Sequence, residues 1–575
     1  MKKTILWCLA LLVLTPTLAQ PQPAIRATDG ILNASSFLPD VARGSWFVIF
    51  GTGLGPATIS IQETLPYQAQ LSGTSITFTP ASGGTPVSAL MYYTLATQAA
   101  GMLPSSTPAG AYNVTVTYNG QTSAAAPVNV VDHNFGFATQ TSNGQGPAQA
   151  TYGGYNLNRF TTGKLSPWTL QPAHPGDSMV LWGTGIGADP ASDITGGSSG
   201  DQTASAQVSV LVSGISVTPA YAGRSTGSPG LDQINFTIPA NVTPSCFVSL
   251  QVSAGGVLSN LGSIAVAPAG AAACASPMLT ESQLQTLDQG GTLNVGSLHL
   301  GKTATTLTVS PYGTFTIDVQ TAAGWFGKYA VDTVAGANFA LVQSGACFLL
   351  HRTGTTDQIG FGLAPQSMNA GAHLMLNGPN ASNMPIAQMS DESYNTMLYS
   401  SGLDGIGGSG SPTLGQGSYT LSGSGGPDIG AFSATVSLPG DFVWTNQKSI
   451  PNPIPRDAPL KVTWTGGEGG IVSIAGSALT QTGGTLPYAT YSATIFECDA
   501  PASAGSFTIP SSMLEQLPAI SSDPASGAFG TLALIATPDP AQHLGLFTAS
   551  MTAGGSIDLG VLTYGVTYIQ AVGFN

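Results

Sequence analysis

The sequence predicts an all-β protein of tandem immunoglobulin-like β-sandwich domains, followed by further β-sandwich domains with one or two short helices. Charged residues make up only 7% of the 575 residues, whereas Gly (74) and Pro (40) are abundant. Short runs of apolar and β-branched residues end at Gly, Asn or Pro, which is typical of strands and tight turns. One block of the first half also occurs twice, and each copy has the length of an immunoglobulin-like domain.

The chain begins with the three parts of a secretory signal peptide. Two lysines precede an apolar run over residues 5–14, and a Thr-Leu-Ala sequence ends at Ala19. We expect residues 1–19 to be removed after Ala19, which makes the mature protein secreted, extracellular or attached to the cell surface. The apolar run is too short to span a bilayer, and no transmembrane segment is expected in the mature chain.

The charge balance disfavours nucleic acid as a partner. The sequence holds 27 acidic against 13 basic residues, a formal net charge of -14, and removal of the signal peptide makes it more negative. Nucleic-acid binding needs a basic surface to neutralise phosphates. The expected partner is an extracellular polysaccharide or a surface protein.

Four cysteines follow the signal peptide: Cys246, Cys274, Cys347 and Cys498. An even number in an oxidising compartment predicts two disulfides, for which three pairings are possible. We favour Cys246 with Cys274, because they flank consecutive predicted strands and close a short loop. This choice leaves Cys347 to pair with Cys498 across a long stretch of sequence.

The repeat is clearest where an apolar strand runs into a glycine-rich turn. Residues 44–55 (GSWFVIFGTGLG) return as residues 176–187 (GDSMVLWGTGIG), and residues 98–104 correspond to residues 233–239. The spacing predicts two copies of one sandwich, over residues 28–131 and 165–274. Residues 132–164 are then a Gly-rich connection that packs through its aromatic residues.

Each copy also predicts a late hairpin. In the first copy, Tyr112, Val114, Val116 and Tyr118 alternate with mostly polar residues, as one buried strand face requires, and Asn119-Gly120 supplies the turn. In the second copy, the same places are taken by Cys246, Val248, Leu250 and Val252, and the turn by Gly255-Gly256.

These copies resemble the IPT/TIG immunoglobulin-like fold, in particular the Solibacter-type C-terminal domain family of exported bacterial proteins. The resemblance is carried by the GTGLG and GTGIG turns, by residues 229–235 (PGLDQIN) and by residues 255–260 (GGVLSN). The first copy departs from it at residues 98–101 (QAAG). The family has no established activity, so the resemblance implies a fold and export but no catalytic residue.

The second half predicts a β-rich domain over residues 275–440 and a C-terminal immunoglobulin-like β-sandwich over residues 441–575. A capping-box pattern at Thr280 to Gln283 predicts a short helix that ends at Gly290, and residues 512–515 predict another. The boundary is placed where a strand gives way to Pro439-Gly440.

Motifs for catalysis, cofactors and metals are better explained as structural features. The GRSTG sequence at residues 223–227 fits a serine-hydrolase elbow, but Pro229 and a strand follow it instead of a helix. The GTGLG turn lacks a βαβ context. The six histidines are scattered, and the adjacent Asp391 and Glu392 point to opposite faces of a strand. We therefore assign no catalytic, cofactor-binding or metal-binding residue, and expect no cofactor.

The tryptophans leave two interpretations open. Trp168, Trp325 and Trp444 either pack in the core or form a platform on which a sugar ring stacks. Trp46 and Trp182 lie in the repeated apolar strand and are expected in the core or at its edge.

Tandem modules without a catalytic motif favour a secreted or cell-surface, non-catalytic structural or binding protein that contacts polysaccharide or envelope partners. The alternative is a secreted hydrolase whose carboxylates, distant in sequence, meet in one pocket within residues 275–575. A third possibility is a component of a surface assembly that pairs through exposed strand edges.

Overall fold

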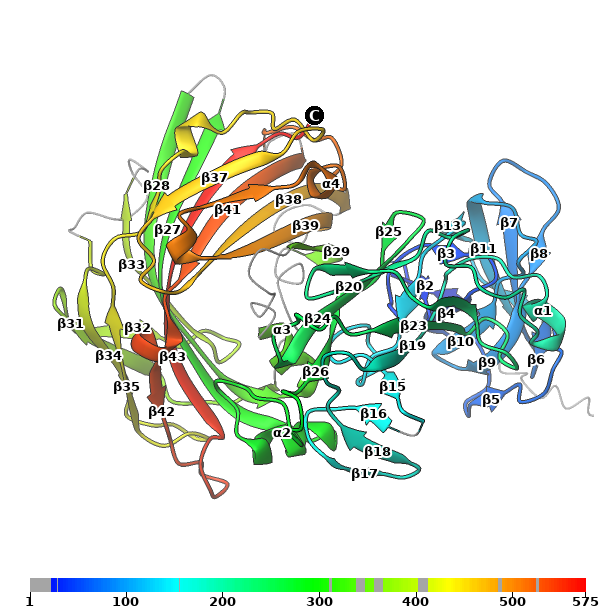
Figure 1. Ribbon diagram of the computed structural model, residues 1–575, viewed down its shortest axis with the longest axis horizontal. Helices are drawn as coiled ribbons and strands as arrows, with labels where there is room; N and C mark the ends of the chain where they lie inside the picture. The colour runs from blue at the N-terminus through cyan, green and yellow to red at the C-terminus, as the bar shows by residue number, and fades with distance from the viewer. Residues whose placement is uncertain are drawn as a thin grey trace, which may run out of the picture.

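A computed structural model of the protein describes residues 22–27, 29–154, 156–309, 313–337, 347–355, 366–401, 412–483, 489–523 and 527–575. The expected signal peptide lies outside these residues. Within them, the strands form seven sheets and the α-helices are few and short, so the predicted all-β class is confirmed. Two sandwiches follow one another, and a larger β-region with a long curved sheet completes the molecule (Figure 1).

The first sandwich consists of two facing sheets. One contains β1 (Ala24–Ile25), β2 (Ile31–Asn33), β4 (Trp46–Thr52), β5 (Ser60–Ile61), β9 (Leu90–Leu95) and β10 (Gln98–Met102). The other contains β3 (Val41–Ala42), β6 (Gln70–Leu71), β7 (Thr74–Pro80), β8 (Val87–Ser88), β11 (Gly110–Tyr118), β12 (Gln121–Thr122) and β13 (Ala126–Val131). Tyr112, Val114 and Val116 enter the core between the sheets, as the alternation predicts. Asn119 and Gly120 both have positive φ, which the tight β11–β12 turn requires.

The second sandwich also has two sheets, and the segment expected as a connection belongs to one of them. Its larger sheet contains β14 (Gly136–Phe137), β15 (Ala150–Tyr152), β16 (Asn156–Asn158), β17 (Gly163–Leu165), β18 (Trp168–Gln171), β19 (Ser178–Thr184), β22 (Tyr221–Arg224) and β23 (Asp232–Thr237). Its smaller sheet contains β20 (Ser209–Val212), β21 (Ile215–Val217), β24 (Ser245–Ala254), β25 (Val257–Leu258) and β26 (Gly262–Val266). Residues 132–164 therefore supply β14, β15, β16 and the start of β17, and Phe135 and Phe137 are fully buried in the core of this sandwich.

Strand β24 differs from the prediction of one buried face. Val248, Leu250 and Val252 enter the core of the sandwich, but a bulge between Ser245 and Val248 turns Cys246 into a separate cluster. That cluster joins the second sandwich to the C-terminal region and buries Phe247, while Gln251 is buried where it donates to the carbonyl oxygen of Leu349.

The C-terminal region is organised by one ten-stranded sheet. This long sheet contains β27 (Leu293–Val309), β28 (Gly313–Tyr329), β29 (Cys347–Thr355), β30 (Gln366–Ser367), β33 (Tyr394–Ser401), β38 (Ile471–Gly483), β39 (Thr490–Pro501), β41 (Ala528–Thr537), β42 (Gly545–Phe547) and β43 (Leu559–Val572). A four-stranded sheet contains β31 (His373–Gly378), β32 (Ala381–Ala387), β34 (Gly417–Gly423) and β35 (Phe432–Leu438). A three-stranded sheet contains β36 (Val443–Trp444), β37 (Leu460–Thr465) and β40 (Ser506–Ile509). Each small sheet packs over its own part of the long one.

This arrangement corrects the boundary placed near residue 440. β27 pairs in parallel with β43, so strands from both sides of residue 440 share one sheet. The Pro439-Gly440 sequence instead connects the two small sheets, from the end of β35 to the start of β36. Residues 441–575 are thus not a separate sandwich.

The helices are α1 (Ser192–Thr195), α2 (Glu281–Asp288), α3 (Val331–Ala337), α4 (Ser511–Leu514) and α5 (Pro540–His543). The predicted capping box is confirmed at α2, where Thr280 and Gln283 exchange side-chain to backbone hydrogen bonds. Both favoured disulfides form, Cys246 with Cys274 and Cys347 with Cys498. No helix in the described ranges is long and apolar enough to cross a membrane.

Candidate functional site

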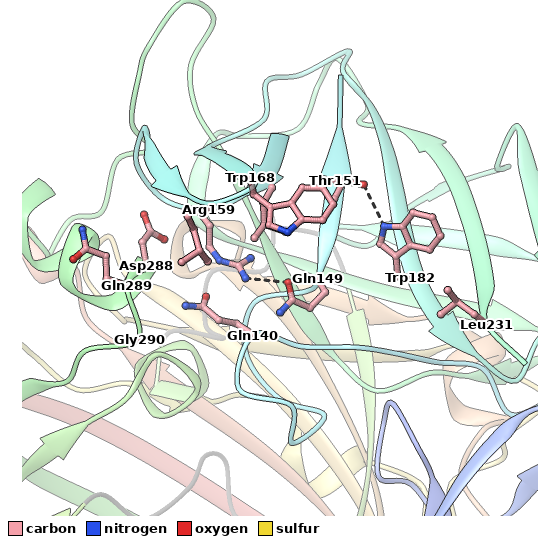
Figure 2. A pocket seen from close by; sticks show the side chains of 12 residues that line it. Gln140, Gln149, Thr151, Arg159, Trp168, Trp182, Leu231, Asp288, Gln289 and Gly290 are labelled. Carbon is pink, nitrogen blue, oxygen red and sulfur yellow. Dashed lines mark hydrogen bonds between the residues drawn. The ribbon is translucent and has the colours of Figure 1, made fainter. Parts of the chain in front are cut away.

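A pocket of about 630 Å³ lies on the outer face of the larger sheet of the second sandwich (Figure 2). We call it the tryptophan pocket. Its walls come from this sheet, from the loop between β14 and β15, and from the end of α2. The lining residues are Gln140, Gln149, Thr151, Leu157, Arg159, Leu165, Trp168, Trp182, Leu231, Asp288, Gln289 and Gly290.

Strand alternation places Trp182 in this pocket. Met179 and Leu181 of β19 enter the core, so Val180 and Trp182 must point to the opposite face. The Trp182 indole Nε1 donates a hydrogen bond to Thr151 Oγ1 on β15, at 3.2 Å. The expectation that Trp182 packs in or at the core is therefore corrected, since its half-buried ring lies on the outer face.

The platform of Trp168, Trp325 and Trp444 does not form. Trp168 is half-buried on β18 and lines the tryptophan pocket, as the sugar-stacking interpretation requires. Trp444 is only 4% exposed and belongs to the core under the three-stranded sheet, whereas Trp325 lies on β28 of the long sheet. Trp168 is instead joined by Trp182. Trp46, the other tryptophan expected in the core, is half-buried and stacks on Tyr92 with ring centres 5.0 Å apart.

A buried arginine forms part of the polar wall. Arg159 follows β16 and is only 3% exposed. Its Nη1 donates to the carbonyl oxygen of Asn158 at 2.7 Å, and its Nη2 donates to Gln149 Oε1 at 3.0 Å (Figure 2). Gln140 donates its Nε2 to the carbonyl oxygen of Leu287 on α2, at 2.9 Å. These bonds orient the two glutamines along one wall.

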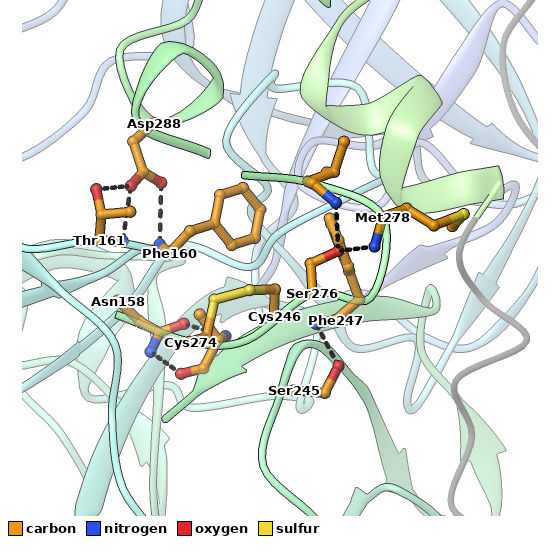
Figure 3. The surroundings of a disulfide bond; sticks show 12 residues. Asn158, Phe160, Thr161, Ser245, Cys246, Phe247, Cys274, Ser276, Met278 and Asp288 are labelled. Atoms are coloured by element: carbon orange, nitrogen blue, oxygen red, sulfur yellow. Dashed lines mark hydrogen bonds between the residues drawn. A yellow bond between two sulfur atoms is a disulfide. The ribbon is translucent and has the colours of Figure 1, made fainter. Parts of the chain in front are cut away.

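Asp288 attaches the end of α2 to the second sandwich (Figure 3). Its carboxylate accepts hydrogen bonds from the backbone amides of Phe160 and Thr161 and from the Thr161 hydroxyl, at 2.9 to 3.0 Å. The Cys246–Cys274 disulfide belongs to the same apolar cluster as Phe160. The carboxylate, the disulfide and this cluster together hold the α2 wall against the sheet.

Two opposite charges are buried at this wall. Burial lowers the pKa of Arg159 to about 10, and the charge of Asp288 opposes that shift. Burial also raises the pKa of Asp288, while the hydrogen bonds from Phe160 and Thr161 and the charge of Arg159 oppose this. Arg159 therefore stays protonated at neutral pH, and Asp288 is the counter-charge. A charge-balanced wall suits a neutral, hydroxyl-rich ligand.

Asp288→Asn should lower the free energy of unfolding by about 1–3 kcal/mol, because its NH2 group replaces an oxygen that accepts from Phe160 or Thr161 and leaves that buried backbone amide without an acceptor. Urea unfolding at neutral pH measures this loss. Asp201→Asn is the matched control, since Asp201 also accepts from a Thr amide and hydroxyl, at Thr203, but is exposed. Equal losses in the two variants would contradict the role of Asp288.

The motifs read as structural do not assemble into a reaction centre. Arg224 of the GRSTG sequence ends β22 with its side chain fully buried against Asp232, and β23 follows in place of a helix. Asp391 lies in an exposed turn and accepts a hydrogen bond from the hydroxyl of Ser393. Across the described ranges, no three His, Cys, Asp or Glu side chains are arranged to hold a metal ion.

The sequence did not identify most residues of the tryptophan pocket. Only Trp168 was singled out as a binding candidate. Gln140, Gln149 and Arg159 lie in the segment expected as a connection, and Asp288 ends a helix that was predicted without a partner. Their distances along the chain give no periodic signal, so only the fold brings them together.

The fold defines the chain as an all-β protein of tandem immunoglobulin-like sandwiches. A scan against protein-family models found no match, and a search of curated proteins found none either. Among solved structures, the chain is similar to Bacteroides ovatus mixed-linkage glucan utilization locus SGBP-B in complex with a mixed-linkage heptasaccharide. The identity is 12%, the match covers 94% of this chain and 97% of that chain, and the TM-score is 0.12.

Two further structures show likeness of the same order. SGBP-B from a complex xyloglucan utilization locus in Bacteroides uniformis matches at 9% identity over 66% of this chain and 86% of that chain, with a TM-score of 0.14. Domains 5-6 of the S-layer protein SbsC match at 13% identity over 43% of this chain and 99% of that chain, with a TM-score of 0.15. Such TM-scores carry no argument about function, which has to be argued from the residues of this chain.

Proposed function

We propose that this chain is a secreted or cell-surface, non-catalytic protein that binds a neutral polysaccharide in the tryptophan pocket. The observation that carries the proposal is the pairing of Trp168 and Trp182 in one pocket with amide side chains along its wall. An indole offers a flat apolar face to a sugar ring, and amides exchange hydrogen bonds with sugar hydroxyls.

The dimensions and charge of the pocket support this ligand class. About 630 Å³ lies within the range of small-ligand sites, and the open rim allows a longer chain to continue beyond it. The buried charges of Arg159 and Asp288 compensate each other, so neither a strongly anionic nor a strongly cationic ligand is favoured.

Export and family membership belong to the same proposal. Two disulfides suit an oxidising compartment, and the N-terminal pattern suits a signal peptide that ends at Ala19. Membership of the Solibacter-type IPT/TIG family rests on the GTGLG and GTGIG turns and the PGLDQIN sequence. Trp168, Trp182 and Leu231 of the tryptophan pocket lie in the second copy, which matches this family better than the first copy does.

One observation favours the alternative of a secreted hydrolase. Asp318 and Asp441, far apart in sequence, line the same pocket of the C-terminal region. However, the Asp441 side chain is 91% exposed. A general acid in a glycosidase is kept protonated by burial, which this carboxylate lacks. Binding without cleavage is therefore the better reading of that pocket too.

Trp168→Ala and Trp182→Ala should each weaken glycan binding by about 10- to 100-fold, because each removes an aromatic face from the pocket. A glycan array first selects a ligand for the purified mature protein. Titration calorimetry with that oligosaccharide then measures the affinity of each variant.

Tyr118→Ala, at a half-buried tyrosine of the first sandwich, is the control and should bind like the wild type. Unchanged affinity in both tryptophan variants, or no binding to any neutral glycan on the array, would overturn the proposal. Release of new reducing ends from the selected glycan would support the hydrolase instead.

A further inference from the structure

A second pocket lies in the C-terminal region, on the face of the long sheet that the small sheets cover. The four-stranded sheet covers one part of this face around Leu298 and Leu562, and the three-stranded sheet covers another around Ile474 and Leu534. Between the two covers, polar side chains of β27, β28 and β43 line a pocket of about 350 Å³. We call it the seam pocket.

The seam pocket contains hydrogen-bonding groups of every kind. The Lys302 ammonium lies 4.0 Å from Asp441 Oδ1, and Asp318 Oδ2 accepts from the Ser401 hydroxyl at 3.2 Å. Gln320 is only 7% exposed and accepts from the backbone amide of Leu414 at 2.7 Å. The seam pocket therefore contains both donors and acceptors, and charges of both signs.

Tyr564 offers its hydroxyl to the seam pocket. Its side chain is 3% exposed and lines the seam pocket. Burial, helped by the negative charge of Asp441, raises the pKa of its hydroxyl, which stays protonated. No hydrogen bond joins this hydroxyl to another residue in the described part of the chain. The hydroxyl oxygen is not among the buried unsatisfied atoms, so it reaches the pocket and can bond to whatever enters it.

The neighbouring Tyr568 shows the contrast. It lies four residues along the same strand and donates its hydroxyl to the carbonyl oxygen of Phe442 at 2.8 Å. The hydroxyl of Tyr568 thus bonds within the protein, whereas the hydroxyl of Tyr564 faces the pocket. Pro439-Gly440 leads the chain between the small sheets, which brings Asp441 and Phe442 to this rim.

We infer that the seam pocket is a second binding site, for a short neutral saccharide. An anionic ligand would meet Asp318 and Asp441, and a cationic one would compete with Lys302 for Asp441. A neutral sugar can donate hydrogen bonds to the two carboxylates and accept them from Lys302 and Tyr564, so it can bond to charged groups of either sign. The inference takes its ligand class from the proposed function but uses none of the residues of the tryptophan pocket.

Calorimetric titration of the full mature chain with the array-selected oligosaccharide tests this inference. The wild type should bind two ligands per chain, and the Trp168→Ala/Trp182→Ala variant should bind one. Tyr564→Phe in that background should weaken the remaining event by about 10-fold, the loss expected for one hydrogen bond. Adding Asp318→Asn should abolish it.

Tyr419→Phe is the matched control, because its hydroxyl is satisfied internally by Thr413 and Gly415. It should lower the melting temperature and leave the seam affinity unchanged, whereas Tyr564→Phe should lower affinity and leave the melting temperature unchanged. A single event in the wild type that the tryptophan variants abolish would overturn the seam site alone. Two events that the tryptophan variants leave intact would overturn the tryptophan pocket, and no event at all would overturn both.

Discussion

Arg224→Met should lower the free energy of unfolding at pH 8 by about 3–5 kcal/mol, because it leaves a buried carboxylate without its partner. Arg224 Nη1 and Asp232 Oδ1 are 2.6 Å apart, and both side chains are fully buried. Asp232 also accepts from the backbone amide of Ile186, and Arg224 Nη2 donates to the carbonyl oxygen of Gly187. The pair thus fixes the glycine turn that follows β19.

The loss should shrink in acid. Burial raises the pKa of Asp232 to about 6, and the charge of Arg224 opposes this shift, so the variant should raise it further. A carboxyl group with a raised pKa holds its proton in the folded state when the unfolded state has released it. Below about pH 6 both folded chains hold this proton, so the extra loss in the variant is absent there and grows as the pH rises from 6 toward the higher pKa of the variant. Urea unfolding at pH 4.5 and pH 8 measures the difference.

Two variants control this experiment. Arg43→Met breaks an ion pair with Asp132 in which the side chains are 33% and 57% exposed, so it should cost less than about 1 kcal/mol. Arg224→Met/Asp232→Asn removes both buried charges, keeps an acceptor for the Ile186 amide and should recover part of the loss. Similar losses for Arg43→Met and Arg224→Met, or no recovery in the double variant, would contradict the argument.

The Arg224–Asp232 pair also shows how far sequence reasoning reached. The GRSTG sequence fits the pattern of a serine-hydrolase elbow but lacks the helix, and the PGLDQIN sequence carries the resemblance to the IPT/TIG fold. The sequence does not predict the contact between Arg224 and Asp232, because contacts between side chains of neighbouring strands depend on strand register, which a single sequence does not give. The structure shows Arg224 opposite Asp232 in the β22–β23 ladder.

Local sequence signals predict the hairpin and the helix, whereas the domain boundary depends on pairing between strands that are distant in sequence. The hairpin at Asn119-Gly120 and the helix after Thr280 depend on neighbours within a few residues, and both are confirmed. The boundary near residue 440 was wrong because Pro439-Gly440 is also what a linker within one domain looks like. Only the parallel pairing of β27 with β43 shows that the chain returns to the same sheet.

The sequence does not predict the tryptophan pocket, for a related reason. Met179 to Trp182 are all apolar, so the period of two that would place Trp182 on the outer face is invisible in the sequence. Gln149 and Arg159 became functional candidates only when the structure put their segment into the sheet beside β19. Composition could favour a binding protein, but the choice of pocket needed strand order.

Asp499→Asn should raise the free energy of unfolding above pH 8, by up to about 5 kcal/mol. The reason is that the ionised carboxylate of Asp499 is buried beside a second carboxyl group. Phe496 and Cys498 of β39 enter the core under the three-stranded sheet, which puts Glu497 and Asp499 together on the opposite face. Both are buried, and Asp499 Oδ2 has no hydrogen-bond partner among the residues that the structure describes. Ser473 donates its hydroxyl to Asp499 Oδ1 at 2.5 Å.

The sign of this effect follows from the direction of the shift. Burial, followed by the charge of Glu497, raises the pKa of Asp499 to about 8, and the bond from Ser473 opposes this. Between about pH 4 and pH 8 the folded chain holds a proton that the unfolded chain has released, so stability falls as the pH rises. Asp499→Asn removes that slope, and its gain should vanish below about pH 4.

Urea unfolding of the wild type and the variant at pH 5, 7 and 8.5 measures the slope. Glu497→Gln removes the neighbouring charge and should lower the pKa of Asp499, so the fall in stability should end at a lower pH. Asp391→Asn gives the opposite sign, because the hydroxyl of Ser393 lowers the pKa of this exposed carboxyl and the variant loses that stabilisation above the unfolded pKa. A wild type whose stability rises from pH 5 to pH 8.5 while Asp499→Asn changes nothing would show that Asp499 is ionised without penalty. That outcome would contradict the argument that burial and the neighbouring Glu497 disfavour an ionised Asp499 on β39.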